Sequence, residues 1–310
     1  MQLTKAQALS PATPRKRGLG LRRREMLMGY LTLSPWAVGF LVFTLGPMIA
    51  SLWFSFSEYK IIQPPRWVGL ANYQRMFEDE LFYKSLSVTV RYTIAAVPFG
   101  ILTALIVAVL LNQNVWGARV MRTIFYLPSV ISGVAVSLVF AWIFNHRFGI
   151  LNYIIGLFGI RGPDWLGWRQ WALPAFVLMS LWGIGGNMII LLAGLQGVPV
   201  SLHEAAEIDG ATPWKRFWSI TLPMISPAIL FVSIMSVIGS FQTFTQAYIM
   251  TGGGPAYATL FYLLYLYRNA FSWFEMGYAS ALAWVLFAII LVCTLLGLRV
   301  SRSWVHYEGG

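Results

Sequence analysis

The chain has 310 residues, of which 58% are hydrophobic and only 11% are charged, and its net charge is +11. A soluble domain usually carries about 25% charged residues, so this composition excludes an ordinary soluble protein. No charged residue occurs in 26–57, 92–118 or 276–298, and about 20 apolar residues are enough to cross the hydrocarbon core of a bilayer. The composition therefore indicates a polytopic membrane protein.

The excess of positive charge lies mainly ahead of the first apolar run. Seven of the 22 basic residues fall in the first 24 positions, and basic residues that flank a first span hold that end in the cytoplasm. A nucleic-acid-binding arm and a cleaved signal peptide are the alternatives, but the apolar run after Glu25 is too long for the core of a signal peptide. We therefore expect residues 1–27 to form a basic cytoplasmic tail and expect no nucleic-acid partner.

Six apolar runs predict an all-α fold with six transmembrane helices. In chain order they cover about 28–56, 92–111, 124–144, 172–195, 225–249 and 279–298. An even number of spans places the C-terminus on the same side as the N-terminus, in the cytoplasm. The expected division is a six-helix membrane domain over 28–300 and a cytoplasmic tail over 301–310.

The loops give partial support for this orientation. Segments predicted inside hold 13 basic residues and segments predicted outside hold nine if Arg91 is counted with them, so the N-terminal tail, with seven of the 13, decides the orientation. The outer segments 58–90, 145–171 and 250–278 are rich in Trp and Tyr, which favour the membrane interface.

Metal and redox chemistry have little support in the chain. The single cysteine, Cys293, excludes a disulfide framework, and the three histidines lie in different connecting segments. The six runs contain no Asp, Glu or His, which argues against a proton relay, although a sodium site built from neutral oxygens stays open. We expect no catalytic residue, no metal ligand and no cofactor in this chain.

A polar stretch, HEAAEIDGATPWKRFWSITLP at 203–223, interrupts the apolar pattern between the fourth and fifth runs. Ser201 and Glu204 have the spacing of a capping box at a helix start. Gly210 suits the left-handed residue that ends a helix, and Pro213 suits the first position of a second one. The stretch predicts two short helices joined by a hinge.

The first of these helices carries a face of small residues. Leu202, Ala205 and Ala206 share one side at helical spacing, and small side chains let another backbone approach closely. The second helix has an aromatic face suited to the inner membrane surface, formed by Trp214, Phe217 and Trp218. The functional interpretation of this stretch is a surface on which another protein docks. The alternative is a well-folded loop that only connects two spans.

The spacing of this stretch resembles a known motif. Glu204-Ala205-Ala206, three residues, Gly210, nine residues and then Ile220-x-Leu222-Pro223 is similar to the EAA motif of permease subunits of ATP-binding-cassette (ABC) importers. In that family the loop is a coupling helix that seats in a cleft of the ATPase subunit. The resemblance implies ATPase-coupling roles for Glu204, Ala205, Ala206, Asp209 and Gly210.

The resemblance extends over about 27–300. Segments 34–56, 68–77, 192–199 and 252–259 look like the maltose-type carbohydrate-uptake branch. It implies a type I importer fold in the cytoplasmic (inner) membrane, and it implies partners: a second EAA-type permease, two ABC ATPases that carry ATP and Mg, and an extracytoplasmic solute-binding protein. The chain itself has no phosphate-binding G-x-x-x-x-G-K-[ST] loop, because none of its five lysines follows a glycine. Hydrolysis is therefore expected on another chain.

The fifth run is the most polar of the six, and its polar residues recur at helical spacing close to mid-membrane. Hydroxyls, amides and aromatic faces suit a neutral polyhydroxyl solute such as a sugar, whereas helix packing is the plain explanation. Related permeases bind sugar with the spans that flank the EAA loop. The candidate path residues are Trp182, Asn187, Ser236, Gly239, Ser240, Gln242, Thr243 and Gln246.

The expected function is sugar import by alternating access, and the chain is expected to be a transport subunit and not an enzyme. Glycerol phosphate or another non-sugar solute is an alternative cargo. A membrane-embedded glycosyltransferase is a further alternative, but the only acidic cluster outside, 78–80, has the character of a solvated loop end. A scaffold that only anchors ATPases is a third.

Overall fold

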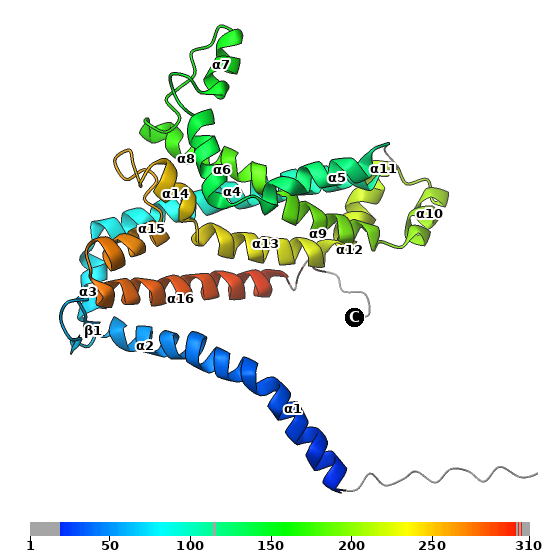
Figure 1. Ribbon diagram of the computed structural model, residues 1–310. Coiled ribbons are helices and arrows are strands. Elements are labelled where there is room, and N and C mark those ends of the chain that lie inside the picture. The colour runs from blue at the N-terminus through cyan, green and yellow to red at the C-terminus, as the bar shows by residue number, and fades with distance from the viewer. Residues whose placement is uncertain (1–18, 114–115, 302, 304, 306–310) are drawn as a thin grey trace, which may run out of the picture. The chain divides into compact units, whose positions relative to one another are not determined.

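The computed structural model describes residues 19–113, 116–301, 303 and 305 (Figure 1). Residues 1–18 of the predicted N-terminal tail and most of the predicted C-terminal tail lie outside the described residues. The chain divides into two compact units, Met1–Trp53 and Phe54–Gly310.

The described part of the first unit is helical throughout. Helix α1 (Leu19–Phe40) continues through a π-helical turn, η1 (Leu41–Leu45), into α2 (Gly46–Ser55), and 20–55 is long and apolar enough to cross a membrane. The Thr32 hydroxyl donates to Met28 O at 2.8 Å, and the Ser34 hydroxyl donates to Leu31 O at 2.9 Å. These bonds supply the partners that lipid cannot offer.

The second unit contains the remaining candidate spans. Three more segments pass the length and hydropathy test: α4 (Glu80–Asn112), α13 (Ser226–Phe241) followed by α14 (Thr245–Met250), and α16 (Met276–Ser301). Two further pairs pass it together but are bent: α5 (Ala118–Tyr126) and η2 (Leu127–Val130) with α6 (Gly133–Ile143) by 97°, and α8 (Arg169–Ser180) and η3 (Leu181–Gly183) with α9 (Gly185–Gln196) by 50°. The described chain thus has four candidate spans, or six if each bent pair is one span, in agreement with the predicted membrane fold.

Three predicted helices are not continuous. The run 172–195 bends by 50° at Ile184, between η3 and α9. The run 124–144 breaks at Ile131 and Ser132, which have extended backbone, because Pro128 lacks an N–H and opens a 3₁₀ turn in its place. The run 225–249 breaks at 242–244, between α13 and α14.

Short helices, turns and irregular loops join the spans, and the strands assigned among the described residues are two antiparallel two-residue strands, β1 (Ser57–Glu58) and β2 (Arg66–Trp67). At one end of the unit lie α3 (Ala71–Glu78), α15 (Tyr262–Tyr267) and η5 (Arg268–Ser272), and α7 (Ile150–Leu157) projects separately beyond α6. At the opposite end lie α10 (Val200–Ile208), α11 (Pro213–Arg216), η4 (Phe217–Thr221) and α12 (Leu222–Met224) (Figure 1).

Helix α4 lies at the centre of the second unit and packs on α8, α9, α13 and α15. Ala104 and Ala108 are fully buried in the cluster that α4 shares with α9 and α13, and small side chains allow such close helix approach. Thr89 and Thr93 are buried on the same helix. Thr89 Oγ1 accepts from Tyr262 N at 2.9 Å, and the hydroxyls of Thr93 and Ser240 are 2.8 Å apart.

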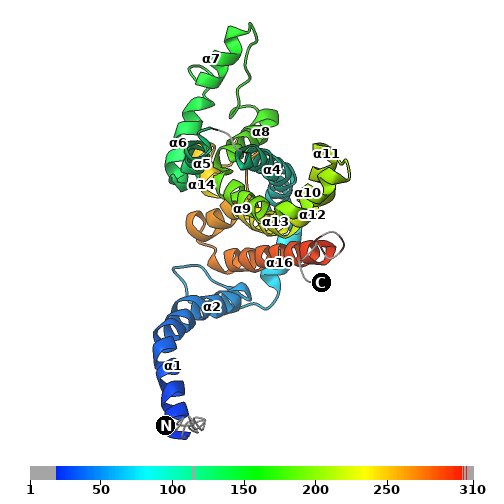
Figure 2. The same cartoon turned by 90° about the vertical axis from the view of Figure 1, so that its right-hand side faces the viewer.

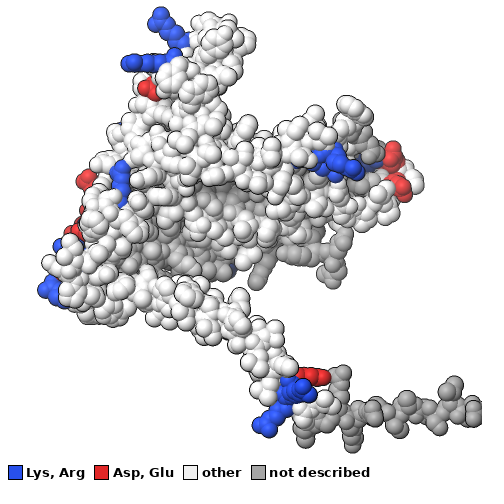
Figure 3. Space-filling view, viewed as in Figure 1, with Lys and Arg blue, Asp and Glu red and all other residues white. Residues whose placement is uncertain are grey.

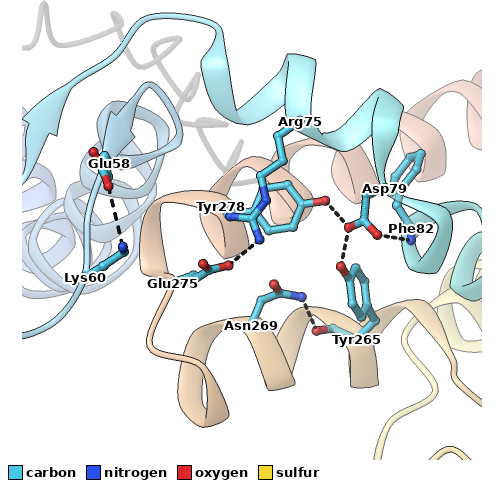
Figure 4. A network of polar contacts seen from close by, with 9 residues as sticks. All are labelled: Glu58, Lys60, Arg75, Asp79, Phe82, Tyr265, Asn269, Glu275 and Tyr278. Atoms are coloured by element: carbon cyan, nitrogen blue, oxygen red, sulfur yellow. Dashed lines mark hydrogen bonds and ion pairs between the residues drawn. The ribbon is translucent and has the colours of Figure 1, made fainter.

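Helix α4 starts twelve residues before its predicted start because Asp79 caps it. The Asp79 carboxylate accepts from Leu81 N at 2.9 Å and from the hydroxyls of Tyr265 and Tyr278, the latter at 2.5 Å (Figure 4). Burial raises the pKa of Asp79, but the hydrogen bonds from the tyrosines and the backbone outweigh it, so the pKa lies below its ordinary value of 3.8. The charged form of Asp79 thus ties α4 to α15 and α16.

A second contact reinforces this junction. Arg75 in α3 forms an ion pair with Glu275 at 2.7 Å, and its guanidinium carbon lies 4.3 Å from the centre of the Tyr278 ring (Figure 4). The start of α16 also packs closely on β1, because a Cβ at Gly277 would lie 2.1 Å from Ser57 O. Glycine is therefore required at this crossing.

Candidate functional site

Helix α10 ends as the sequence predicts. Gly210 has φ +74°, Gly210 N donates to Glu207 O at 3.0 Å, and Ala211 N donates to Ala206 O at 2.9 Å. This pair of bonds is the Schellman arrangement, in which the left-handed residue is normally glycine. The prediction of a helix end at Gly210 is confirmed.

The predicted start of α10 is wrong. The helix begins at Val200 with Pro199 in the capping position, and no side chain caps it. Ser201 is already inside the helix, so it does not form the capping box with Glu204. Pro199 has φ −59°, close to the value that its ring imposes, and so it leads directly into the first turn.

The second helix restarts as predicted. Thr212 Oγ1 accepts from Lys215 N at 3.3 Å, and Pro213 occupies the first helical position. Arg216 reaches back to α10 and pairs with Glu207 at 2.9 Å. The three predicted aromatic residues contact one another in successive ring pairs: Trp214, Phe217 and Trp218. Helices α10 and α11 therefore form one braced block.

The residues of the EAA stretch lie at the surface of this block. Glu204 and Ala205 are exposed, Ala206 is half-buried, and Glu204 forms no ion pair within the described residues. Red carboxylates mark the α10 end in Figure 3, next to the basic side chains. Val200 and Ile208 are exposed apolar residues on the same helix. The block thus offers an accessible surface of small, apolar and acidic side chains.

A cavity of about 370 Å³ lies among α4, η2, α6, α8–α9 and α13–α14. Seven of the eight candidate path residues line it: Trp182, Asn187, Ser236, Gly239, Ser240, Thr243 and Gln246. Gln242 is not part of the lining, because it caps the C-terminal end of α13 and is exposed. The helix break at 242–244 separates it from its predicted neighbours.

Two hydrogen bonds hold polar groups of the cavity in place. Asn187 Nδ2 donates to Ser236 Oγ at 3.1 Å, which joins α9 to α13, and Ser240 pairs with Thr93 of α4. The described lining residues include no Asp, Glu, Lys, Arg or His. The cavity therefore combines an uncharged polar wall with aromatic surface, of which the half-exposed ring of Trp182 is a part.

Sequence reasoning missed part of the lining. Tyr92, Ser129 and Ser180 also face this cavity. Tyr92 is the first residue of the second apolar run, and its position at the edge of that run is the only local signal. Ser129 faces the cavity because the α-helix ends after α5 and a 3₁₀ turn follows. Helical periodicity in the sequence does not reveal this interruption.

Metal chemistry has no site in the described part of the chain. Within those residues there is no group of three or more His, Cys, Asp and Glu side chains placed to hold an ion.

Residues 96–304 match the family of binding-protein-dependent transport system inner membrane components. The chain belongs to this family. It is 45% identical over 291 residues to the probable ABC transporter permease protein YesP of Bacillus subtilis, which covers 92% of this chain and 94% of that protein. It is 33% identical to the trehalose/maltose transport system permease protein MalF of Thermococcus litoralis, over 91% of this chain and 96% of that one.

Solved structures agree with this assignment. A chain of a bacterial ABC transporter involved in the import of the acidic polysaccharide alginate superposes with a TM-score of 0.80 at 25% identity, over 91% of this permease and 96% of that chain. The protein is thus a multi-pass inner-membrane permease subunit of an ABC importer, and a transport subunit with no catalytic domain. The resemblance stated from the EAA spacing is confirmed.

Two neighbouring glycines at the start of α9 provide a test of its contact with α5. A Cβ at Gly185 would lie 2.4 Å from Phe125 O and 2.7 Å from Tyr126 Cα, whereas nothing lies within 4 Å of a Cβ at Gly186. Gly185→Ala should therefore push α5 and η2 away from α9 and lower the free energy of unfolding by about 1–3 kcal/mol. Thermal unfolding of the detergent-solubilised protein measures this.

Gly186→Ala is the matched control, and it should leave the midpoint unchanged or slightly raised, since alanine favours helix over glycine. Equal midpoints for the two variants would contradict the close contact between α5 and α9.

Proposed function

We propose that this permease imports a neutral carbohydrate through the cavity of about 370 Å³ and that α10 couples it to an ATPase subunit. The main support for the proposal is the uncharged lining of the cavity, whose residues come from separate helices. Hydrogen bonds between Asn187 and Ser236 and between Thr93 and Ser240 already orient polar side chains there. A sugar presents ring faces to aromatic side chains and exchanges hydrogen bonds through its hydroxyls. A buried site of this kind selects for such a partner because unpaired buried polar groups are costly.

The names of similar proteins point to carbohydrate-containing solutes, of which sulfoquinovosyl glycerol is anionic. The chain is 34% identical to the sulfoquinovosyl glycerol permease SmoG of Agrobacterium fabrum, over 90% of this chain and 92% of that one. It is also 33% identical to the multiple sugar-binding transport system permease MsmF of Streptococcus mutans, over 84% and 91%. Carbohydrate-containing solutes are the common theme of these names, together with that of the trehalose/maltose relative.

The coupling role rests on the braced block of α10 and α11. A rigid block transmits displacement, and its small residues, Ala205 and Ala206, leave room for a partner surface. With α10 on the cytoplasmic side, both termini are also cytoplasmic. The proposed assembly contains a second EAA-type permease, two ABC ATPases that hold ATP and Mg, and an extracytoplasmic solute-binding protein, and it works in the bilayer by alternating access.

An anionic solute is the second candidate, because the structurally similar transporter imports the acidic polysaccharide alginate. A carboxylate or a phosphate requires positively charged partners, and the described lining of this cavity has none. Glycerol phosphate or an acidic sugar would therefore need a cation from the second permease. The neutral carbohydrate fits this chain better.

Two glutamines provide a matched test of the path. Gln246 lines the cavity and Gln242 does not, so Gln246→Ala removes a hydrogen-bonding group from the path and Gln242→Ala does not. We expect Gln246→Ala to lower uptake of a radiolabelled sugar at sub-saturating concentration by about 5- to 10-fold, the effect of one hydrogen bond.

Gln242→Ala should stay within about twofold of wild type in the same vesicles. The path assignment fails if the two variants transport equally well, or if Gln242→Ala has the larger defect.

A charge reversal tests the coupling block. Glu204 is exposed and forms no ion pair within the described chain, so Glu204→Lys should fold normally and still lose its contact with the ATPase. Uptake and substrate-stimulated ATP hydrolysis in proteoliposomes should both fall about tenfold or more, as expected when a central contact is lost.

The control is Glu78→Lys at the end of α3, an exposed glutamate at the opposite end of the unit. It should leave both activities intact. Normal coupling in Glu204→Lys, with the complex correctly assembled, would rule out the proposed role of α10.

A further inference from the structure

A second cavity, about 530 Å³ in volume, surrounds α7 in the segment between α6 and α8. Figures 1 and 2 both place α7 beyond the end of α6, away from the layer of α13 and α16. The lining comes from one continuous stretch of chain, 142–162, and shares no residue with the transport cavity; it includes Trp142, His146, Arg147, Phe148, Tyr153 and Arg161.

The loops on both sides of α7 are fixed by asparagine side chains. Asn145 Oδ1 accepts from Arg147 N at 3.0 Å. Asn152, on α7 itself, donates to His146 O at 3.2 Å and to Pro163 O at 3.1 Å. The helix is thus bonded to the loop before it and to the loop after it, so the cavity wall is built before any ligand arrives.

The cavity is positively charged. Arg147 and Arg161 enter it from the two ends of the segment, beside His146, and the described lining contains no Asp or Glu. Neither guanidinium forms an ion pair or a hydrogen bond within the described part of the chain. Blue side chains project at the α7 end in Figure 3. Two like charges that share a wall without a counter-charge favour a bound anion.

The segment 145–171 is also more basic than is usual for a segment on the outer side of a membrane. Lys and Arg concentrate in short cytoplasmic loops, yet the segment 145–171, expected outside, holds three arginines and one carboxylate, Asp164. Asp164 Oδ1 accepts from Gly167 N at 2.9 Å within its own loop, and Asp164 is not part of the cavity wall. The outer arginines therefore lack an acidic neighbour in the cavity.

Helix α7 is apolar on two faces. Leu151 and Ile155 pack on the core cluster that contains Phe144 and Trp165. The adjoining face, which Phe158 continues at the C-terminal cap, follows the i, i+3, i+4, i+7, i+8 pattern and is exposed, with Phe158 78% exposed: Ile150, Tyr153, Ile154, Leu157 and Phe158. A surface helix normally turns polar residues outward, so this second face requires an apolar partner.

We propose that the α7 cavity binds the phosphate of an anionic phospholipid, whose acyl chains lie along the exposed apolar face of α7. Arginine is suited to phosphate because its planar fork donates two parallel hydrogen bonds. Trp142, Phe148 and Tyr153 supply the aromatic surface that prefers the boundary between headgroups and chains. A single lipid molecule thus satisfies both the basic cavity and the apolar face.

The test uses the full-length protein in mild detergent with equal amounts of phosphatidylglycerol and phosphatidylcholine, and native mass spectrometry counts the retained lipids. Wild type should retain phosphatidylglycerol preferentially. Arg147→Gln combined with Arg161→Gln should lower the ratio of phosphatidylglycerol to phosphatidylcholine by about 30-fold, from the loss of two charges near a phosphate.

Arg169→Gln is the matched control, since Arg169 begins α8 in the same segment and is not part of the cavity lining. It should keep the wild-type ratio. Arg147→Lys with Arg161→Lys should keep most of the preference, and unchanged circular dichroism should show that all variants fold.

Equal retention of the two lipids by wild type, or an unchanged ratio in the double glutamine variant, would overturn the proposal. Displacement of phosphatidylglycerol by millimolar inorganic phosphate would assign the cavity to a soluble anion and overturn it as well. The proposal would also be overturned if the double glutamine variant kept its lipid preference but no longer bound the solute-binding protein. That result would assign the two arginines to the protein partner.

Discussion

A polar group in the hydrocarbon core of a bilayer finds no water, so it must be paired within the protein. This constraint organises the second unit. Thr93 of α4 pairs with Ser240 of α13 between two candidate spans, and Thr89 of the same helix accepts from the backbone of Tyr262 where α4 meets the connecting helix α15. The buried hydroxyls of one central helix therefore position two others. The polar side chains that remain around the cavity are the ones free to bind a solute.

The same constraint explains where the chain changes from apolar spans to polar, hydrogen-bonded segments. At the end that carries α10, side chains return to water, and the backbone is free to form a hinge at Gly210 and a restart at Thr212. At the end that carries α3 and α15, Asp79 stays charged because tyrosine hydroxyls and backbone N–H groups surround it. One end thus carries an exposed hinged block, and the other is held together by internal hydrogen bonds.

Local chemistry made much of this architecture predictable. Apolar runs identify the spans, and Gly210 and Pro213 determine the hinge because each has a conformation that few residues share. Tertiary packing decided the rest: the breaks at 131–132 and 242–244, and the start of α4 at Glu80. Those breaks turned Gln242 away from the cavity and brought Ser129 into it, which helical periodicity does not show.

The central claim is that α10 is the contact through which a separate ATPase moves the uncharged cavity. The most direct measurement is site-specific cross-linking in native membranes, with Ala206→Cys introduced after the single native cysteine is replaced by Cys293→Ser. A short bifunctional reagent should join position 206 to an ATP-hydrolysing subunit, with a yield that changes when nucleotide is added. Absence of any such partner, in membranes that still take up solute, would contradict the account.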